Sequence, residues 1–218
     1  MNGYELIASE AVHDDIDEWC EITPPLTASP RLSRDNDGAT RLFLAAATAF
    51  ASVDELPGID CDALIAMFRR ELGLPADSAW DAAFVQHVGY CSHYDHQLGA
   101  STWPVPRSTS ADDLWLAGID LDLLREDPEP GDIFIVWSEP CGRFVRTGIV
   151  AAVVERRVES KARSYYECVT LEGDLNEDAD GRGSLVRCVR RCLSADSGDC
   201  FIRWADRDVR RGSIRVAA

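Results

Sequence analysis

Three of the four histidines and one cysteine fall within the short segment HVGYCSHYDH, residues 87–96. His87 and Cys91 are four residues apart, so on a helix they share one face. The segment suggests a tetrahedral zinc site with His87, Cys91, His93 and His96 as ligands, in which Asp95 could replace His93 or His96. The alternative is a histidine cluster at a helix end, where positive charge favours the helix dipole. The spacing matches no familiar zinc motif, so we expect no cofactor and keep zinc as the alternative.

The same segment offers a nucleophile. Cys91 could react with His87 or His93 as its base, and Cys141 in the loop EPCG is a second candidate. The eight cysteines contain no CxxC pair, and no export signal is visible. We therefore expect most of the thiols to be reduced and buried as small apolar side chains.

The elements that must position these residues divide into helices first and strands second. Apolar periodicity predicts helices over 39–50, 60–72, 79–91 and 110–124. Ser78 followed by Asp81 matches a capping box at the start of the third helix. Gly73 with Pro75 beyond it marks the end of the second.

Alternating or continuous apolar runs predict five strands in the second half of the chain. They lie at 132–137, 145–154, 165–171, 184–191 and 201–204. Helices followed by an antiparallel sheet of about five strands indicate an α+β fold.

Five short segments of the sequence carry a family resemblance, and they occur in family order at plausible spacings. They are WDAAFV (80–85), PGDI (130–133), RTGIV (146–150), LEGD (171–174) and FIRW (201–204). With these segments the chain resembles the CHAP family of papain-like amidohydrolases and peptidases over residues 75–205. The resemblance implies a papain-like fold of the CHAP/NlpC type. It divides the chain into an N-terminal helical region (1–74), a CHAP-like domain (75–206) and an arginine-rich tail (207–218).

In that family the second position of the first segment is the nucleophilic cysteine, and the first position of the third segment is the histidine base. Those positions hold Asp81 and Arg146 here, and Glu172, or less directly Asp174, stands where a polar residue orients the histidine. A carboxylate does not replace a thiolate in attack on an amide, and arginine stays protonated. No histidine occurs after His96, so the resemblance implies a family member that has lost its dyad.

The replacements suggest an ion pair between Asp81 and Arg146, with Glu172 competing for the arginine. The plain structural alternative is that Asp81 serves its helix end and Arg146 neutralises it. Asp81 with Glu172 is also the only carboxylate pair that the resemblance would bring together for glycosidase-type chemistry. The residues expected to bind a ligand in the remaining cleft are Trp80, Trp103 and Arg146.

The overall composition narrows the classes of partner. The 218 residues carry a net charge of −16, which disfavours general nucleic-acid binding, and no apolar run is long enough to span a membrane. We expect a cytoplasmic protein, with export as an effector as an alternative. The leading hypothesis is a catalytically degenerate CHAP-like protein that binds a protein partner or a peptide-like ligand in a scaffolding or regulatory role. The alternative is an amide or cell-wall hydrolase that uses the histidine–cysteine cluster or a metal.

Overall fold

The structure of the protein is a computed structural model, and its described residues exclude both ends of the chain and some internal segments. It describes residues 37–51, 61–76, 78–95, 100–160, 163–175 and 184–205. The expectations for residues 1–36, His96 and the tail at 207–218 therefore lie outside the described residues.

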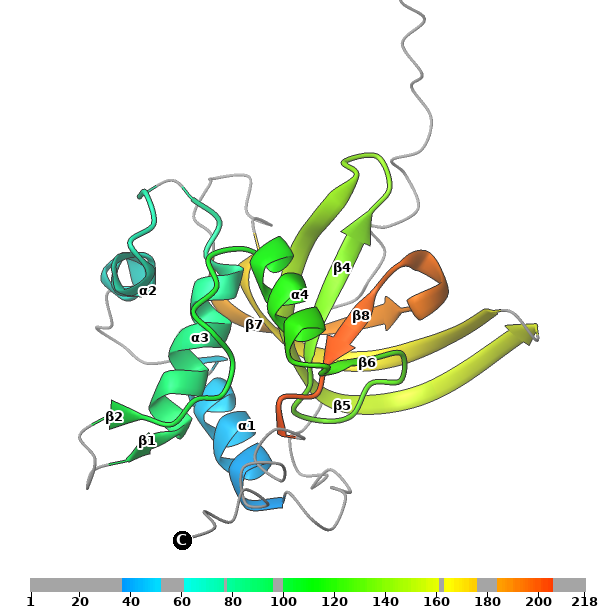
Figure 1. Ribbon diagram of the computed structural model, residues 1–218, viewed down its shortest axis with the longest axis horizontal. Helices are drawn as coiled ribbons and strands as arrows, with labels where there is room; N and C mark the ends of the chain where they lie inside the picture. The colour runs from blue at the N-terminus through cyan, green and yellow to red at the C-terminus, as the bar shows by residue number, and fades with distance from the viewer. Residues whose placement is uncertain are drawn as a thin grey trace, which may run out of the picture.

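The described part of the chain holds four α-helices on one side of a sheet (Figure 1). They are α1 (Asp37–Ala51), α2 (Cys61–Leu72), α3 (Asp81–Ser92) and α4 (Ala111–Asp120). In α1 the buried residues Thr40, Phe43 and Ala47 recur every three or four positions. This is the period of one helix face, so α1 packs on the core along a single stripe.

The end of α2 and the start of α4 follow local sequence signals. Gly73 takes a φ of 71° just after α2, and the N–H of Leu74 returns to the carbonyl of Arg69 at 2.8 Å. Only glycine adopts this left-handed conformation at little cost, which explains why α2 stops there. At α4 the Ser110 hydroxyl caps the helix by accepting the N–H of Asp113 at 3.1 Å.

The sheet has six antiparallel strands in the order β3-β8-β4-β5-β6-β7. The strands are β3 (Leu124–Arg125), β4 (Ile133–Ser138), β5 (Arg143–Ser160), β6 (Arg163–Leu175), β7 (Ser184–Leu193) and β8 (Cys200–Ile202). Five of them were predicted from the sequence, and the two-residue β3 was not. A separate pair, β1 (Tyr94–Asp95) with β2 (Ala100–Ser101), extends from the end of α3, and a 3₁₀ turn spans Ala195–Ser197. The described part of the chain is an α+β structure.

The two faces of the sheet bury different side chains. Ile133, Ile149 and Leu171 face the helices and share one core with Phe43 of α1 and Phe68 of α2. On the other face a smaller cluster packs together, made of Phe134, Val150, Tyr166, Cys168, Leu193 and Phe201. The helices α1 and α2 therefore share a single hydrophobic core with the sheet.

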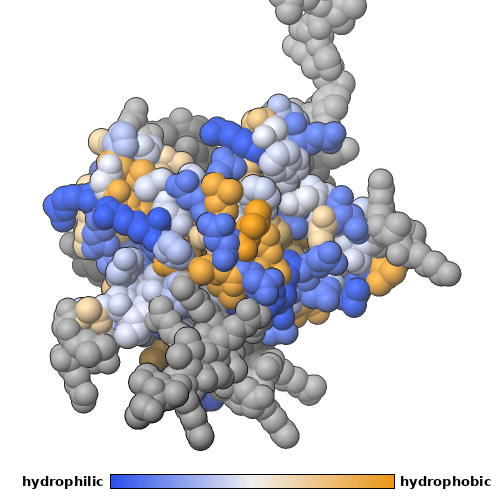
Figure 2. Space-filling model, viewed as in Figure 1, coloured by the Kyte–Doolittle hydropathy of each residue, from blue (hydrophilic) through white to orange (hydrophobic). Residues whose placement is uncertain are grey.

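Two features of the surface stand out beyond this core. The β5–β6 hairpin reaches away from the helices as a two-stranded arm (Figure 1). Apolar side chains gather over the region of α4 (Figure 2), where Leu116 and Ile119 are exposed. Among the described residues, the helices are too short or too polar to cross a membrane.

Candidate functional site

The position that the CHAP resemblance assigns to the nucleophile is buried and serves the fold. Asp81 is the first residue of α3 and is 7% exposed. Its Oδ1 accepts the N–H of Ala82 at 2.8 Å, and its Oδ2 accepts the N–H of Thr147 on β5 at 2.9 Å. The carboxylate thus fastens the start of the helix to the sheet. The capping box predicted for Ser78 is wrong, because Trp80 is the N-cap residue and no side chain caps α3.

The position assigned to the base lies beside this contact, because Arg146 precedes Thr147 on β5. Arg146 is paired with Val136, and Val136 packs with the cluster on the sheet face away from the helices. Side chains alternate along a strand, so Arg146 leaves the sheet on that far face while Thr147 faces α3. To reach Asp81, the Arg146 side chain would have to pass from the far face of the sheet to the face that α3 covers. The ion pair between the two residues therefore stays a prediction.

Glu172 pairs with Arg191 of β7 rather than with Arg146. Its carboxylate is fully buried, and Arg191 binds it with two N–H groups, from Nε to Oε1 and from Nη2 to Oε2 at 2.6 Å. Thr170 adds a hydroxyl donor to Oε1 at 2.5 Å. Asp174 lies two residues further along β6, and its side chain is outside the described part of the structure. Asp81 and Glu172 therefore serve separate hydrogen-bond networks.

All five segments that carry the resemblance are in contact, since Ile149 of the third pairs with Ile133 of the second and Leu171 of the fourth, and two further contacts join the rest. The indole N–H of Trp204 donates to the carbonyl of Gly131 at 2.8 Å, and Arg203 binds the Asp132 carboxylate, with Nη2 3.1 Å from Oδ2. Trp80 packs on Gly173, where a Cβ would lie 2.5 Å from the ring. Burial raises the pKa of Asp132 to about 7, although Arg203 acts in the opposite direction.

The two tryptophans expected at a ligand groove are both in the core. Trp80 is 1% exposed and stacks on Phe68 with ring centroids 5.8 Å apart. Trp103 is 9% exposed and stacks on Phe43 at 5.2 Å. Trp103 also lies directly against Gly89 of α3, where a Cβ would be 2.2 Å from the ring. Glycine at position 89 is thus needed for this close approach, and both indoles are occupied by protein contacts.

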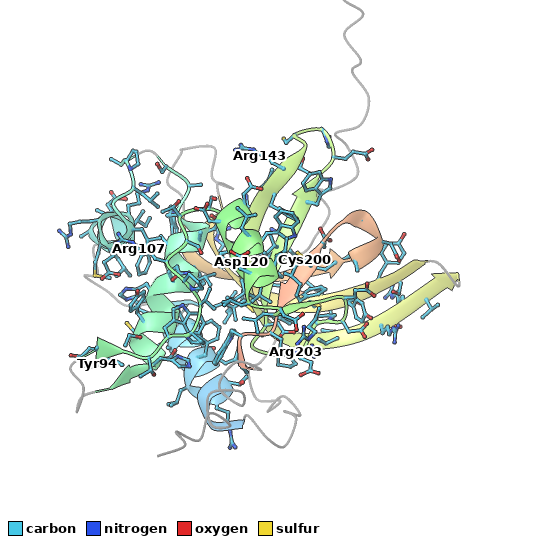
Figure 3. All side chains as sticks on the ribbon, in the orientation of Figure 1. Tyr94, Arg107, Asp120, Arg143, Cys200 and Arg203 are labelled. Atoms are coloured by element: carbon cyan, nitrogen blue, oxygen red, sulfur yellow. The ribbon has the colours of Figure 1, made fainter. Side chains whose placement is uncertain are left out.

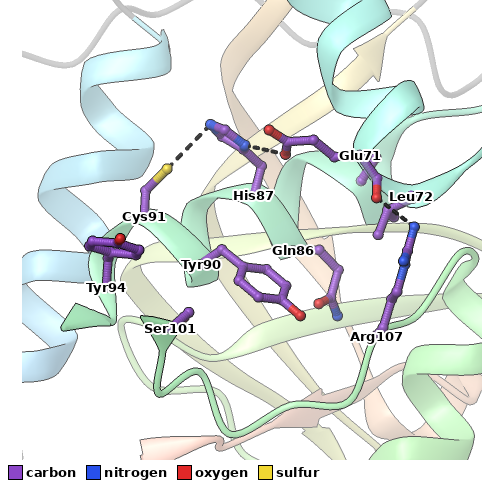
Figure 4. Close-up of a pocket in the computed structure, with 10 residues that line it drawn as sticks. Glu71, Leu72, Gln86, His87, Tyr90, Cys91, Tyr94, Ser101 and Arg107 are labelled. Atoms are coloured by element: carbon purple, nitrogen blue, oxygen red, sulfur yellow. Dashed lines mark hydrogen bonds and ion pairs between the residues drawn. The ribbon is translucent and has the colours of Figure 1, made fainter. Parts of the chain in front are cut away.

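The opposite side of α3 borders a cavity of about 550 Å³ (Figure 4). Its walls come from the end of α2, the outer stripe of α3, and the segment at 101–107. The lining residues are Glu71, Leu72, Ala83, Gln86, His87, Tyr90, Cys91, Tyr94, Ser101 and Arg107. Figure 3 shows Tyr94 on β1 and Arg107 beside α2.

A carboxylate, an imidazole and a thiol form a continuous chain along one wall of this cavity (Figure 4). Glu71 Oε2 lies 2.6 Å from His87 Nδ1, and His87 Nε2 lies 3.3 Å from the sulfur of Cys91. With its proton on Nδ1, His87 donates to Glu71 and accepts from the Cys91 thiol. The four-residue spacing of His87 and Cys91 does place them on one helix face, as predicted. Cys91 is exposed as a residue, but partial burial of its thiol, and secondly the nearby Glu71, raise the pKa of that thiol.

Gln86, one of the residues that line the cavity, has an acceptor that is left unpaired among the described residues. Gln86 is 1% exposed, and its amide nitrogen donates to the carbonyl of Pro106 at 3.1 Å. Its Oε1 is buried and has no hydrogen-bond partner among the described residues. An unpaired buried amide oxygen costs about 1–3 kcal/mol, which a donor from a bound molecule would recover.

Arg107 gives the cavity a cationic group. One of its Nη nitrogens donates to the backbone carbonyl of Glu71 at 2.5 Å (Figure 4), and this bond orients the guanidinium beside the end of α2. The side chain is exposed, so its other N–H groups can meet a ligand. A carboxylate is the group that suits a guanidinium best.

The predicted zinc ligands do not come together in the described structure. His93 turns away from His87 and packs against Trp103 and Trp204, with ring centroids 5.0 and 4.8 Å apart. Among the residues that the structure describes, no three histidine, cysteine or acidic side chains form a group that could hold a metal ion. His96 lies outside those residues.

The sequence did not point to three residues of this cavity, namely Glu71, Gln86 and Arg107. Glu71 is sixteen positions before His87, and Gln86 and Arg107 belong to different elements. No local pattern joins them, since they meet only because α2 packs beside α3. The one available signal was the stripe of Ala83, His87 and Cys91, whose spacing of four marks a common helix face.

Comparison of the chain with protein families, with curated proteins and with solved structures finds no match. The candidate site is therefore assessed from its own geometry.

Proposed function

We propose that the protein is a CHAP-like domain without the family's catalytic dyad, and that it binds a peptide-like ligand in the cavity between α2, α3 and residues 101–107. The observation that carries the binding proposal is the buried, unpaired Oε1 of Gln86 at the cavity floor. A backbone N–H of a ligand would supply the missing donor.

The loss of amidase chemistry at the old nucleophile position is supported by the environment of Asp81. Both of its oxygens accept backbone N–H groups, so the carboxylate already has a structural task. The contacts among the resemblance segments, such as Trp204 with Gly131 and Trp80 with Gly173, support the CHAP-like assignment.

The chemistry of the cavity favours a peptide-like ligand over a purely apolar one. Gln86 Oε1 is an unused acceptor for an N–H, Arg107 suits a terminal carboxylate, and Leu72 with Ala83 offers apolar surface for a side chain. The volume of about 550 Å³ lies within the range of about 300–1,000 Å³ that small-molecule sites occupy. A short peptide with a free carboxylate satisfies all three groups.

Binding of N-acetyl-alanyl-leucine, followed by chemical shifts in ¹H–¹⁵N spectra, tests this function. We expect shifts at α3 and residues 101–107. Gln86→Leu, which removes the acceptor, should weaken binding about tenfold, the equivalent of one hydrogen bond. Arg107→Gln should weaken binding of the acid but not of the corresponding C-terminal amide.

Arg143→Gln is the matched control, because Arg143 is an exposed arginine on β5 outside the cavity lining. The proposal is wrong if the dipeptide leaves the α3 resonances unmoved, or if Gln86→Leu and Arg143→Gln bind it equally well.

A further inference from the structure

Cys91 is an exposed thiol at the cavity wall with a proton acceptor beside it. Its thiol is exposed at the cavity wall and lies 3.3 Å from the imidazole Nε2 of His87. Glu71 holds the other ring nitrogen at 2.6 Å, which fixes the ring orientation. A nucleophile, a base within hydrogen-bond reach and a group that orients the base are the parts of a nucleophilic site.

We propose that Cys91 accepts an acyl group from a thioester bound in this cavity. The proposal rests on the ligand-binding role of the same cavity, with the peptide-like moiety as the acyl part of the ligand. The Cys91 sulfur attacks the thioester carbonyl while His87 Nε2 takes the thiol proton. The carbon–sulfur bond of the ligand breaks, and His87 returns the proton to the departing thiolate. The products are an S-acylated Cys91 and a free thiol, with no change in oxidation state.

The place of Cys91 on its helix selects thioesters over amides. Cys91 lies in the last turn of α3, whose backbone carbonyls rather than N–H groups are left open. This end of the helix dipole disfavours negative charge, so it gives no help to a thiolate or to the oxyanion that amide hydrolysis requires. Transfer of an acyl group from one sulfur to another needs less stabilisation of the thiolate and of the oxyanion, because the leaving group is itself a stable thiolate.

Four of the other described cysteines, Cys141, Cys168, Cys188 and Cys200, lack this arrangement. Burial raises the pKa of Cys168 and Cys200 to about 12, and it also raises that of Cys188. Cys141 is exposed, like Cys91, but lies in the turn after β4, with the backbone N–H of Cys141 bonded to Ser138. Cys141 is therefore a matched control for reactivity that comes from exposure alone.

The groups around His87 hold its ring in place. The titratable and charged side chains of the cavity are Glu71 from α2, Tyr90 and Cys91 from α3, Tyr94 from β1, and Arg107. The rings of Phe50 and Phe68 cover the imidazole from α1 and α2. Among the described residues, Glu71 is the carboxylate that contacts the ring. Its removal should leave the ring orientation unfixed, so the rate of proton transfer from Cys91 should fall.

The test is acylation of the full chain by S-phenyl thioacetate. The rate is measured from the thiophenol that is released, and the acylated residue is identified by peptide mass spectrometry. We expect one acetyl group, on Cys91. Cys91→Ala should remove it, and Cys141→Ala should leave the rate unchanged. His87→Gln should slow acylation by about 100-fold, the lower range for loss of a general base. Glu71→Gln, a change at a positioning residue, should slow it about tenfold, and the conservative Glu71→Asp should keep more of the rate than Glu71→Gln.

Two results would overturn the proposal, provided that each variant keeps the circular dichroism spectrum of the parent. One is acylation spread equally over Cys91 and Cys141, and the other is a His87→Gln variant that reacts as fast as the parent. Binding of N-acetyl-alanyl-leucine to Cys91→Ala separates this inference from the proposed function. If the peptide binds but Cys91 is not acylated, only the thiol chemistry fails. If Cys91 is acylated but the peptide does not bind, only the peptide-binding role fails.

Discussion

The buried pair of Glu172 and Arg191 offers the sharpest test of what holds the sheet together. Glu172 is fully buried, and within the described part of the chain its carboxylate is bound by Arg191 and Thr170. Arg191→Met keeps much of the apolar stem of the side chain but removes both N–H donors. Removing one partner of a buried ion pair costs about 3–5 kcal/mol, because the remaining charge stays in a poorly solvated place.

The cost has an upper limit at each pH, because the stranded carboxylate can take up a proton instead. For an ordinary glutamate, protonation at pH 7 costs about 4 kcal/mol, and this falls by about 1.4 kcal/mol for each unit of lower pH. We therefore expect Arg191→Met to lose about 3–4 kcal/mol of unfolding free energy at pH 7 and only about 1 kcal/mol at pH 5. Urea denaturation followed by circular dichroism at both pH values measures this difference.

Arg190→Met is the matched control on the same strand. Arg190 binds Glu167 at 2.8 Å on the surface, where such a pair contributes about 0–1 kcal/mol. Adding Glu172→Gln to Arg191→Met should recover much of the loss, since the amide carries no charge to bury. The reasoning is refuted if Arg191→Met and Arg190→Met are equally stable, or if the loss does not shrink at pH 5.

Three further predictions concern other buried contacts. Gly89→Ala should destabilise the protein by about 1–2 kcal/mol, because overpacking against Trp103 costs more than the gain in helix propensity, and a blue or red shift of tryptophan fluorescence should accompany it. An unchanged melting temperature and spectrum would contradict this close contact. Asp81→Ala should cost about 1–3 kcal/mol in urea denaturation by leaving the buried N–H of Thr147 unpaired, and a loss within about 0.5 kcal/mol would argue against that bond. Burial raises the pKa of Asp132 from 3.8 to about 7, so the folded protein keeps a proton there that the unfolded chain releases. The free energy of unfolding should therefore fall by up to about 1.4 kcal/mol per pH unit as the pH rises between these values. Asp132→Asn should flatten this slope, and a slope that the substitution leaves unchanged would contradict the reasoning.

The sequence predicted the larger elements because their patterns are local. The helices expected at 39–50, 60–72 and 79–91 correspond to α1, α2 and α3, and the five longer strands lie where alternation placed them. The pair of strands β1 and β2 and the strand β3 were not predicted, because two residues are too few to show alternation. Strand β5 runs to Ser160, beyond the predicted end at 154, since its outer part forms the arm and carries no core pattern.

The candidate site was only half visible in the sequence. His87 and Cys91 were found together because both lie on α3 at helical spacing. Glu71 and Arg107 join them through the packing of α2 and of the segment after β2, and nothing in the local sequence encodes that packing. His93 illustrates the opposite failure, since its place near Cys91 in sequence does not decide which side of the helix end its ring takes.

The contact between Phe43 and Trp204 has a consequence for how the chain is made. Their ring centroids are 5.1 Å apart, although the two residues are separated by most of the described chain. On a ribosome the chain emerges from its N-terminal end, so α1 appears long before the indole that covers it. Until residue 204 has left the exit tunnel, Phe43 lacks part of its burial, and such long-range closure slows folding. We expect nascent chains that stop before β8 to hold α1 loosely and to be the preferred substrates of chaperones and proteases.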